Sequence, residues 1–404
     1  MSATAIAPPA AAASGSRILV VDDNEANRDM LSRRLARQGH GVAMASGGQE
    51  ALDLLAAEPF DLVLLDIMMP GMNGYEVLER VKGDEALRHI PVIMITALTE
   101  MDSVVRCIEM GADDHLPKPF NATLLRARVD ASLSRKRLRD RERQLALAMA
   151  RELEIGRNIQ KGFLPSALPA IPGWELAARF RPARQVAGDF YDAFALTDSA
   201  AGGRVALVVS DVCDKGVGAA LFMAVFRSLI RVLLRESYAA APGRSDAEHL
   251  PHALSVLSDY NALTHPDANM FATVYIAVLD PAGGTLTYVN AGHDPPALLR
   301  DGAILRRLGP TAPAVGLIDG LSFGVETLVL EPGDMLLAFT DGVSEARGAD
   351  GDFYGEPRLF AAAAGPDASA AALVDAIDAD LGGHTMGAEP YDDITLMAVR
   401  RLRA

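Results

Sequence analysis

Short apolar runs alternate with stretches of helical spacing over the first third of the chain. Four of the runs predict strands, at residues 17–21, 61–65, 91–95 and 115–116. Residues 25–38, between the first two, place Met30, Leu31 and Leu35 on one side of a helix. Apolar strands that alternate with helices predict an α/β fold with a doubly wound parallel sheet, covered on both faces.

Polar residues follow the carboxyl ends of these strands, where the ligand site of such a sheet lies. They are Asp22, Asp23, Asp66, Thr96 and Lys118. Three carboxylates would hold one Mg²⁺, while a hydroxyl and an ammonium would hold the oxygens of a phosphoryl group. The sequence therefore predicts a magnesium-dependent phosphoryl site at this edge of the sheet.

Residues 16–135 resemble a two-component receiver domain, a flavodoxin-like fold whose core would span residues 16–120. The resemblance rests on Val-Val-Asp-Asp, Leu-Leu-Asp-Ile-Met-Met-Pro-Gly-Met-Asn-Gly, Ile-Thr-Ala and Leu-Pro-Lys-Pro-Phe. It implies that Asp66 accepts phosphate from a sensor histidine kinase or a phosphotransfer protein. The Mg²⁺ ligands that it implies are Asp22, Asp23, Asp66 and the backbone carbonyl of Met68.

In the same resemblance, Thr96 and Lys118 would sense the phosphoryl group. The chain departs from the family three residues before the lysine, where receivers often carry a Tyr or Phe that swings inward on activation. Here the residue is His115. Either His115 is a tolerated surface residue, or the switch works differently or depends on pH.

The stretch from residue 121 to residue 164 predicts a long helical linker. Asn121 suits the N-cap, no proline follows until Pro165, and the composition is rich in Leu, Ala, Arg and Glu. Leu138 and Leu145 are seven residues apart and begin an imperfect heptad pattern. The pattern favours a parallel coiled coil, and hence a homodimer formed through the linker.

Residues 165–404 contain many short β-branched and apolar runs, together with helix-like stretches at 218–234 and 368–382. Strands and helices in this order predict a layered α/β sandwich.

Four acidic islands stand out in this second domain. They are Gly188-Asp-Phe-Tyr-Asp192, Ser210-Asp-Val212, Phe339-Thr-Asp-Gly342 and Tyr391-Asp-Asp-Ile-Thr395. A single Asp-Gly pair is often only a turn. Carboxylates that converge at strand ends, however, repel one another unless something neutralises them, and hard divalent cations do so. Two such ions close together can activate a water and clamp a phosphoryl group.

The second domain resembles the SpoIIE-like serine/threonine phosphatases, the bacterial branch of the metal-dependent protein phosphatase 2C (PPM) superfamily. The four islands carry the resemblance together with Met-Phe-Ala-Thr273 and Asn290-Ala-Gly-His-Asp-Pro-Pro296. The metal ligands that it implies are Asp189, Asp211, Asp341, Asp392 and the backbone carbonyl of Val212. Asp211 would bridge two Mn²⁺ or Mg²⁺ ions, and the water between them would attack phosphorus directly.

Some residues around these motifs allow two interpretations. Asp393 would support the site without binding a metal. His293 could be a general base or metal ligand, or it could have a structural role near the site. Cys213, where the family often has Ser, is either a small buried residue or a redox-sensitive thiol. Ala187 and Gly348 also differ from the family's usual residues, but neither change removes a ligand.

Composition and charge limit the binding partners and the cellular compartment that the sequence predicts. The net charge of −15 argues against general binding to nucleic acid or anionic membranes. The two cysteines, Cys107 and Cys213, lie in different halves, which favours a reducing cytoplasm over a disulfide framework. Residues 1–15 are expected to be a disordered leader. No apolar run is expected to approach the roughly 18 residues that span a bilayer.

Together these features predict a response regulator in which Asp66 controls hydrolysis of phosphoserine or phosphothreonine on a protein. The resemblance suggests a STAS-type anti-sigma-factor antagonist as substrate, within a partner-switching pathway. Two alternatives are a phosphorylation-switched, non-catalytic scaffold and a phosphatase for another phosphoprotein or a small phosphate ester. The chain has no basic C-terminal helix-turn-helix, so DNA binding is a weaker interpretation.

Overall fold

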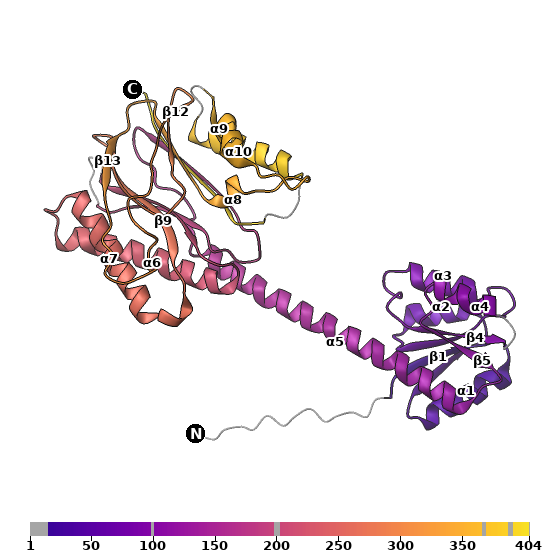
Figure 1. Cartoon of the computed structure of the whole chain (residues 1–404). Helices are drawn as coiled ribbons and strands as arrows, with labels where there is room; N and C mark the ends of the chain where they lie inside the picture. The colour runs from indigo at the N-terminus through magenta and orange to yellow at the C-terminus, as the bar shows by residue number, and fades with distance from the viewer. Residues whose placement is uncertain (1–14, 98–100, 198–202, 366–368, 387–390, 404) are drawn as a thin grey trace, which may run out of the picture. The chain divides into compact units, whose positions relative to one another are not determined.

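The computed structural model describes residues 15–97, 101–197, 203–365, 369–386 and 391–403. Residues 1–14 of the expected disordered leader lie outside this range. The chain divides into two compact units, Met1–Met149 and Ala150–Ala404 (Figure 1).

The first unit contains one five-stranded parallel sheet in the order β2-β1-β3-β4-β5. Its strands are β1 (Arg17–Val21), β2 (Gly41–Ala45), β3 (Leu62–Asp66), β4 (Val92–Ala97) and β5 (Asp114–Lys118). The intervening helices are α1 (Glu25–Arg37), α2 (Gly48–Ala57), α3 (Gly74–Gly83) and α4 (Met101–Glu109). The predicted doubly wound sheet is confirmed.

Alternate strand residues face opposite layers of helices. Leu19 and Val21 pack on the side of α2 and α3, whereas Ile18 and Val20 pack on the side of α1 and the start of α5. The sequence pattern missed β2. This strand lies at the edge of the sheet and leaves Met44 exposed, so it lacks the continuous apolar run of the central strands.

Helix α5 (Ala122–Lys161) is 40 residues long and confirms the predicted helical linker. The side chain of Asn121 accepts hydrogen bonds from the backbone nitrogens of Thr123 (2.9 Å) and Leu124 (3.1 Å), so it caps the helix as expected. The first turns bury Leu125 and Val129 in the receiver-like unit. Residues 141–152 are all exposed to solvent, and the coiled coil and the homodimer remain predictions.

The second unit is a sandwich of two five-stranded antiparallel sheets. One sheet has the order β13-β10-β9-β8-β7 and the other β12-β11-β14-β15-β6. The strands are β6 (Trp174–Arg181), β7 (Phe190–Ala195), β8 (Val205–Val212), β9 (Ala272–Asp280), β10 (Thr285–Ala291), β11 (Ala297–Arg300), β12 (Ala303–Arg307), β13 (Glu326–Val329), β14 (Met335–Phe339) and β15 (Ile394–Arg401). The helices are α6 (Val217–Ala240), α7 (Asp246–Thr264), the 3₁₀ turn η1 (Pro266–Ala268), α8 (Asp341–Ser344), α9 (Gly355–Ala363) and α10 (Ala370–Thr385).

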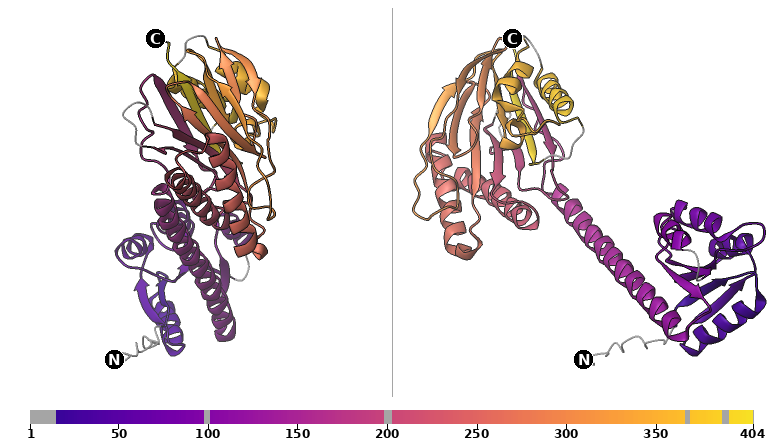
Figure 2. Two further views of the ribbon diagram at one scale, coloured as in Figure 1. Left: turned by 90° about the vertical axis from the view of Figure 1, so that its left-hand side faces the viewer. Right: turned by 45° about the vertical axis from the view of Figure 1, so that its right-hand side comes forward.

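Three apolar cores hold these layers together. The sheets pack face to face around residues such as Tyr275 and Leu336. A second core, with Phe226 and Leu254, joins the first sheet to α6 and α7, and a third, with Leu337 and Ile377, joins the other sheet to α9 and α10. Figures 1 and 2 show the two helix pairs on opposite sides of the sandwich. The layered α/β sandwich is confirmed, and α7, α8 and α9 are present in addition to the two predicted helices.

Helix α6 corrects one sequence expectation. Within the described part of the chain, this 24-residue helix is long and apolar enough to cross a membrane by length and composition. The expectation that no apolar run approaches that length is therefore wrong. The helix packs one face into the second unit's core through Met223, Phe226 and Ile230, and core helices meet the same criterion, so the criterion is weak evidence for a span.

Candidate active sites

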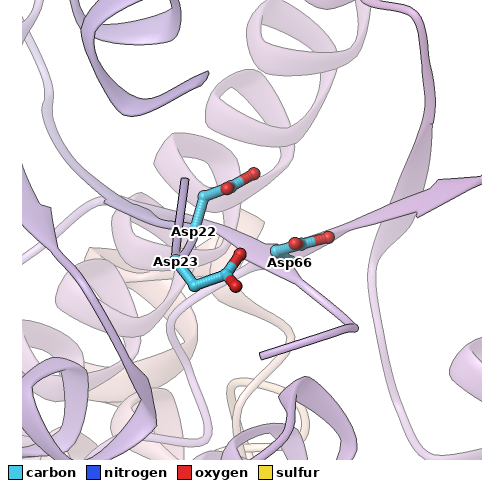
Figure 3. Close-up of side chains that lie close together, drawn as sticks. All are labelled: Asp22, Asp23 and Asp66. Atoms are coloured by element: carbon cyan, nitrogen blue, oxygen red, sulfur yellow. The ribbon is translucent and has the colours of Figure 1, made fainter. Parts of the chain in front are cut away.

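Three carboxylates of the first unit meet at the carboxyl ends of neighbouring strands. Asp22 and Asp23 follow β1, and Asp66 ends β3. One ligand oxygen from each lies within 4.8 Å of the others (Figure 3). Asp22 and Asp66 are buried, whereas Asp23 is exposed. Hard oxygen donors so close together fit one Mg²⁺, as the sequence predicts.

Lys118 at the end of β5 closes this cluster. Its Nζ lies 2.9 Å from Oδ2 of Asp66 and 3.1 Å from Oδ2 of Asp22. Burial raises the pKa of Asp66, and the hydrogen bond from Lys118 offsets only part of that rise. Burial lowers the pKa of Lys118, but its hydrogen bonds and charge pairing with Asp66 and Asp22 raise that pKa overall. The ammonium thus stays charged beside the carboxylate predicted to accept phosphate.

The remaining predicted receiver residues lie around this cluster. Thr96 is buried near the end of β4, next to β5, which carries Lys118. The side chain of Met68 is 77% exposed in the loop after β3, so only its backbone carbonyl could serve the site. His115 lies on β5 with its Nδ1 3.8 Å from Asp114, and its part in the switch stays a prediction.

The carboxylates of the second unit come from both sheets. Asp189 directly precedes β7 and Asp211 lies on β8. The β7–β8 register pairs Phe190 with Ser210 and therefore brings the two aspartates side by side. Asp341 begins α8 and is separated from the end of β14 by Thr340 alone, and Asp392 and Asp393 precede β15, the strand paired with β14.

Asp189 is held from the second sheet. Its Oδ2 accepts hydrogen bonds from the hydroxyls of Thr340 and Thr395, both at 2.7 Å. Asp393 holds the preceding loop, because its carboxylate accepts from the backbone nitrogens of Ala183 (2.7 Å) and Gly188 (2.8 Å). These bonds fix the position of the Asp189 carboxylate beside Asp211.

Crowding and burial make these carboxylates difficult to ionise. Burial, followed by the charges of Asp211 and Asp393, holds the pKa of Asp189 well above its usual value. Burial and the charge of Asp341 raise the pKa of Asp211 to about 7, although a hydrogen bond with Asp189 opposes the rise. Burial and Asp392 likewise raise the pKa of Asp341. Divalent cations would relieve this repulsion, and the all-oxygen donor set fits Mn²⁺ or Mg²⁺.

Two aspartates of the acidic islands have other partners. Asp392 forms a 2.7 Å ion pair with Nζ of Lys215, so binding a metal through Asp392 would require the ammonium to move. Asp192 is buried on β7 and pairs with Arg227 (3.1 Å) and Arg231 (2.6 Å) of α6. This carboxylate is thus an anchor for α6 and not part of the cluster. Among the described residues, only the Asp22–Asp23–Asp66 group meets the 4.8 Å spacing, so the second cluster is spread more widely.

The family of the second unit follows from comparison with known proteins. The Stage II sporulation protein E (SpoIIE) family matches residues 201–402, and the response regulator receiver domain matches residues 18–130. The chain belongs to the SpoIIE family. It joins an N-terminal receiver domain to a C-terminal SpoIIE domain, which lies within the second unit.

Individual relatives match parts of the chain. Protein IcfG of Synechocystis sp. is 41% identical over 266 residues, which are 62% of this chain and 41% of IcfG. The response regulator PleD of Caulobacter vibrioides is 45% identical over 122 residues, 30% of this chain and 27% of PleD. The chain thus spans less than half the length of either relative. The SiaA-PP2C domain of Pseudomonas aeruginosa shares the fold of the SpoIIE domain at 21% identity, with a TM-score of 0.50 over 63% of this chain and 98% of that one.

Sequence reasoning overlooked three residues of the SpoIIE domain site. Thr340 and Thr395 donate hydrogen bonds to Asp189, and both lie inside the acidic islands. Their position next to the aspartates in the sequence could have predicted this contact. The third is Asp294, whose pKa is raised to about 6 by burial and by the charge of Asp341. It directly follows His293 in the Asn-Ala-Gly-His-Asp motif.

The geometry separates the alternatives for His293 and Cys213 of the SpoIIE domain. His293 is buried with its Nδ1 2.9 Å from the Thr273 hydroxyl, and burial lowers its pKa to about 4. The register places Thr273 directly opposite Asp211, so His293 contacts a hydroxyl on the same face of the sheet as the Asp211 side chain. Burial raises the pKa of the Cys213 thiol, which disfavours the reactive thiolate. Both observations favour structural roles.

Proposed function

We propose that this chain is a response regulator whose output is metal-dependent hydrolysis of phosphoserine or phosphothreonine on a protein. The observation that carries the proposal is the meeting of Asp189, Asp211 and Asp341 at adjoining strand ends of both sheets, with raised pKa values. Because ionised carboxylates crowded in this way are unstable without counter-charge, the site is suited to divalent cations.

Each residue would have a defined part in the reaction. Asp189, Asp211, Asp341, Asp392 and the Val212 carbonyl would hold two Mn²⁺ or Mg²⁺ ions, with Asp211 between them. The bound ions would supply an acidified water for in-line attack on phosphorus. The hydroxyls of Thr340 and Thr395 keep Asp189 oriented, and Asp393 fixes the loop that carries it.

The receiver domain would supply control. A sensor histidine kinase or a phosphotransfer protein would transfer phosphate to Asp66, with Mg²⁺ held by Asp22, Asp23 and Asp66. Lys118, already 2.9 Å from Asp66, would contact the new phosphoryl oxygens, and Thr96 would approach from the neighbouring strand β4. Phosphorylation would replace the present contact between Lys118 and Asp66, and α5 would transmit this local change.

Helix α5 would also join two copies of the chain. Leu138, Leu145 and Met149 are 60%, 62% and 66% exposed, and apolar side chains at roughly heptad spacing suit a parallel coiled coil. A dimer would bury them. The SpoIIE domains of the two copies would then be held at one end of a shared helix pair.

A phosphorylated STAS-type anti-sigma-factor antagonist is the proposed substrate, supported by the resemblance of the motifs. The site chemistry itself requires only a phosphate ester. A different phosphoprotein is therefore the second candidate, and a non-catalytic scaffold is disfavoured by the presence of every implied carboxylate ligand.

The testing experiment measures turnover of a phosphorylated STAS-domain antagonist with Mn²⁺, with and without acetyl phosphate. Wild type is compared with Asp66→Asn, and Asp53→Asn serves as control, because Asp53 is an exposed carboxylate on α2. Turnover that responds to acetyl phosphate in wild type and the control, but not in Asp66→Asn, is expected. Absence of turnover on both the antagonist and para-nitrophenyl phosphate would overturn the enzymatic proposal in favour of the scaffold.

A further inference from the structure

A cleft with four basic side chains adjoins the carboxylate cluster of the SpoIIE domain. It has a volume of about 680 Å³ and is lined by Arg181, Arg184, Lys215 and Arg347, with Gly342 and Tyr391 among its other walls. Gly342 directly follows Asp341, so the cleft opens beside the predicted metal ligands. A concentration of cations is unexpected in a chain of net charge −15.

An aromatic side chain holds two of these cations in place. Nζ of Lys215 lies 4.2 Å from the centre of the Tyr391 ring, and the guanidinium carbon of Arg347 lies 5.2 Å from it. Arg347 also lies 5.0 Å from the centre of the Phe353 ring. Cation–π contacts orient basic side chains without neutralising them. The contacts with Tyr391 and Phe353 therefore leave the charge of Arg347 available to a ligand.

Ion pairs with carboxylates involve two of the four basic side chains that line the cleft. Arg181 pairs with Asp378 at 2.6 Å, and Lys215 pairs with Asp392 at 2.7 Å. Arg184 lies beside Gly216, and Arg347 lies against the two aromatic rings. Among the described residues, neither Arg184 nor Arg347 forms an ion pair with a carboxylate. Within the described part of the chain, two guanidiniums without a carboxylate partner thus line a cleft next to the proposed reaction centre.

We propose that this cationic cleft, lined by Arg181, Arg184, Lys215 and Arg347, binds an acidic segment of the phosphoprotein substrate beside its phosphorylated residue. The inference rests on the proposed phosphatase function. Guanidinium groups bind carboxylates through paired hydrogen bonds, and the cleft places them where residues flanking the phosphoserine would lie. The cleft would thereby select substrates by the sequence around the phosphate.

The test compares two phosphoserine peptides, one flanked by Asp and Glu and the other by Asn and Gln, in the full chain with Mn²⁺. Wild type is expected to show a lower KM for the acidic peptide, and this preference is expected to weaken as salt rises. Arg184→Gln and Arg347→Gln should each reduce the preference about two- to fivefold, as is usual for exposed charge pairs. Arg244→Gln removes an exposed arginine from the loop after α6, outside the cleft, and should leave the preference unchanged.

A charge-reversal variant provides a second test of the proposed cleft. Arg347→Glu is expected to favour a Lys-flanked phosphopeptide over the acidic one, which a purely structural role for Arg347 would not produce. Equal KM values for the acidic and neutral peptides in wild type would overturn the inference while leaving the phosphatase intact. Absence of turnover on both peptides and on para-nitrophenyl phosphate would instead indicate failure of the proposed function.

Discussion

The hydroxyl of Thr340 donates a 2.7 Å hydrogen bond to Oδ2 of Asp189, across 151 residues of sequence and between the two sheets of the sandwich. Thr340 is fully buried, and its hydroxyl also accepts a hydrogen bond from the backbone nitrogen of Thr395 at 3.0 Å. The strand end that carries Asp341 is thereby tied to the carboxylate on the opposite sheet. Alignment of the site thus depends on the contact between the two sheets.

Replacing Thr340 by Val should weaken metal binding without removing a metal ligand. The Asp189 carboxylate would lose one of its two hydroxyl donors, and partners of this kind usually change metal affinity about 10- to 100-fold. The Mn²⁺ concentration for half-maximal turnover of para-nitrophenyl phosphate should rise accordingly. Thr287→Val is the matched control, since Thr287 is buried on β10 and its hydroxyl contacts Thr327. An equal shift in both variants would count against the role of Thr340.

Replacing Asp211 by Asn should reduce Mn²⁺-dependent turnover at least about a hundredfold, because the carboxylate would bridge both ions. Without metal, the variant should be no less stable than wild type, since it relieves repulsion from Asp341. Trp174 is the chain's single tryptophan and is buried in the SpoIIE domain, so its fluorescence reports unfolding there. Substantial turnover in a folded variant would refute the bridging assignment.

Stability of the metal-free SpoIIE domain should fall as the pH rises. The folded pKa of Asp211, about 7, lies above its ordinary value of 3.8, so the folded state binds this proton more tightly than the unfolded state does. Protonation therefore stabilises the fold at low pH, and the contribution is lost as the pH rises through about 7. Urea unfolding with a chelator present, followed by Trp174 fluorescence, should show a decrease of roughly a few kcal/mol between about pH 5 and about pH 8.

Two controls identify the cause of that decrease. Asp211→Asn should show a flatter dependence on pH, and Mn²⁺ should restore stability near pH 8 by neutralising the carboxylates. Metal-free stability that instead increased over this range would show that Asp211 ionises freely in the fold.

Transmission through α5 should depend on the rotational phase of the helix. Deleting residues 147–148 turns everything that follows by about 160°, whereas deleting residues 142–148 turns it by only about 20°. Both deletions lie in the exposed stretch of the helix, so the domains themselves should stay folded. The two-residue deletion should abolish the response of turnover to acetyl phosphate, and the seven-residue deletion should retain it. An equal response in both would exclude helical phase as the signal.

Local sequence determined which segments fold and which residues carry chemistry. The apolar runs at β1, β3 and β4 end in the acidic or hydroxyl residues of the receiver cluster, because strand and ligand site are adjacent in the chain. Strand β2 was missed since its edge position leaves Met44 exposed and weakens its apolar pattern. The sequence predicted helix α6 but not that its length and composition would suffice to cross a membrane, because Arg227 and Arg231 stand among its apolar residues.

Only the tertiary structure decided how the acidic residues divide between roles. Asp189 and Asp192 belong to one short motif, yet Asp189 contacts Thr340 and Asp192 pairs with Arg231 of α6. Position on a strand determines which layer a side chain faces, and the partners come from distant segments. The cationic cleft has the same origin, because Arg184 follows β6 and Arg347 follows β14 and α8, and these strands, far apart in sequence, flank β15 in one sheet. Sequence thus defined the reactive groups, and long-range packing decided their partners.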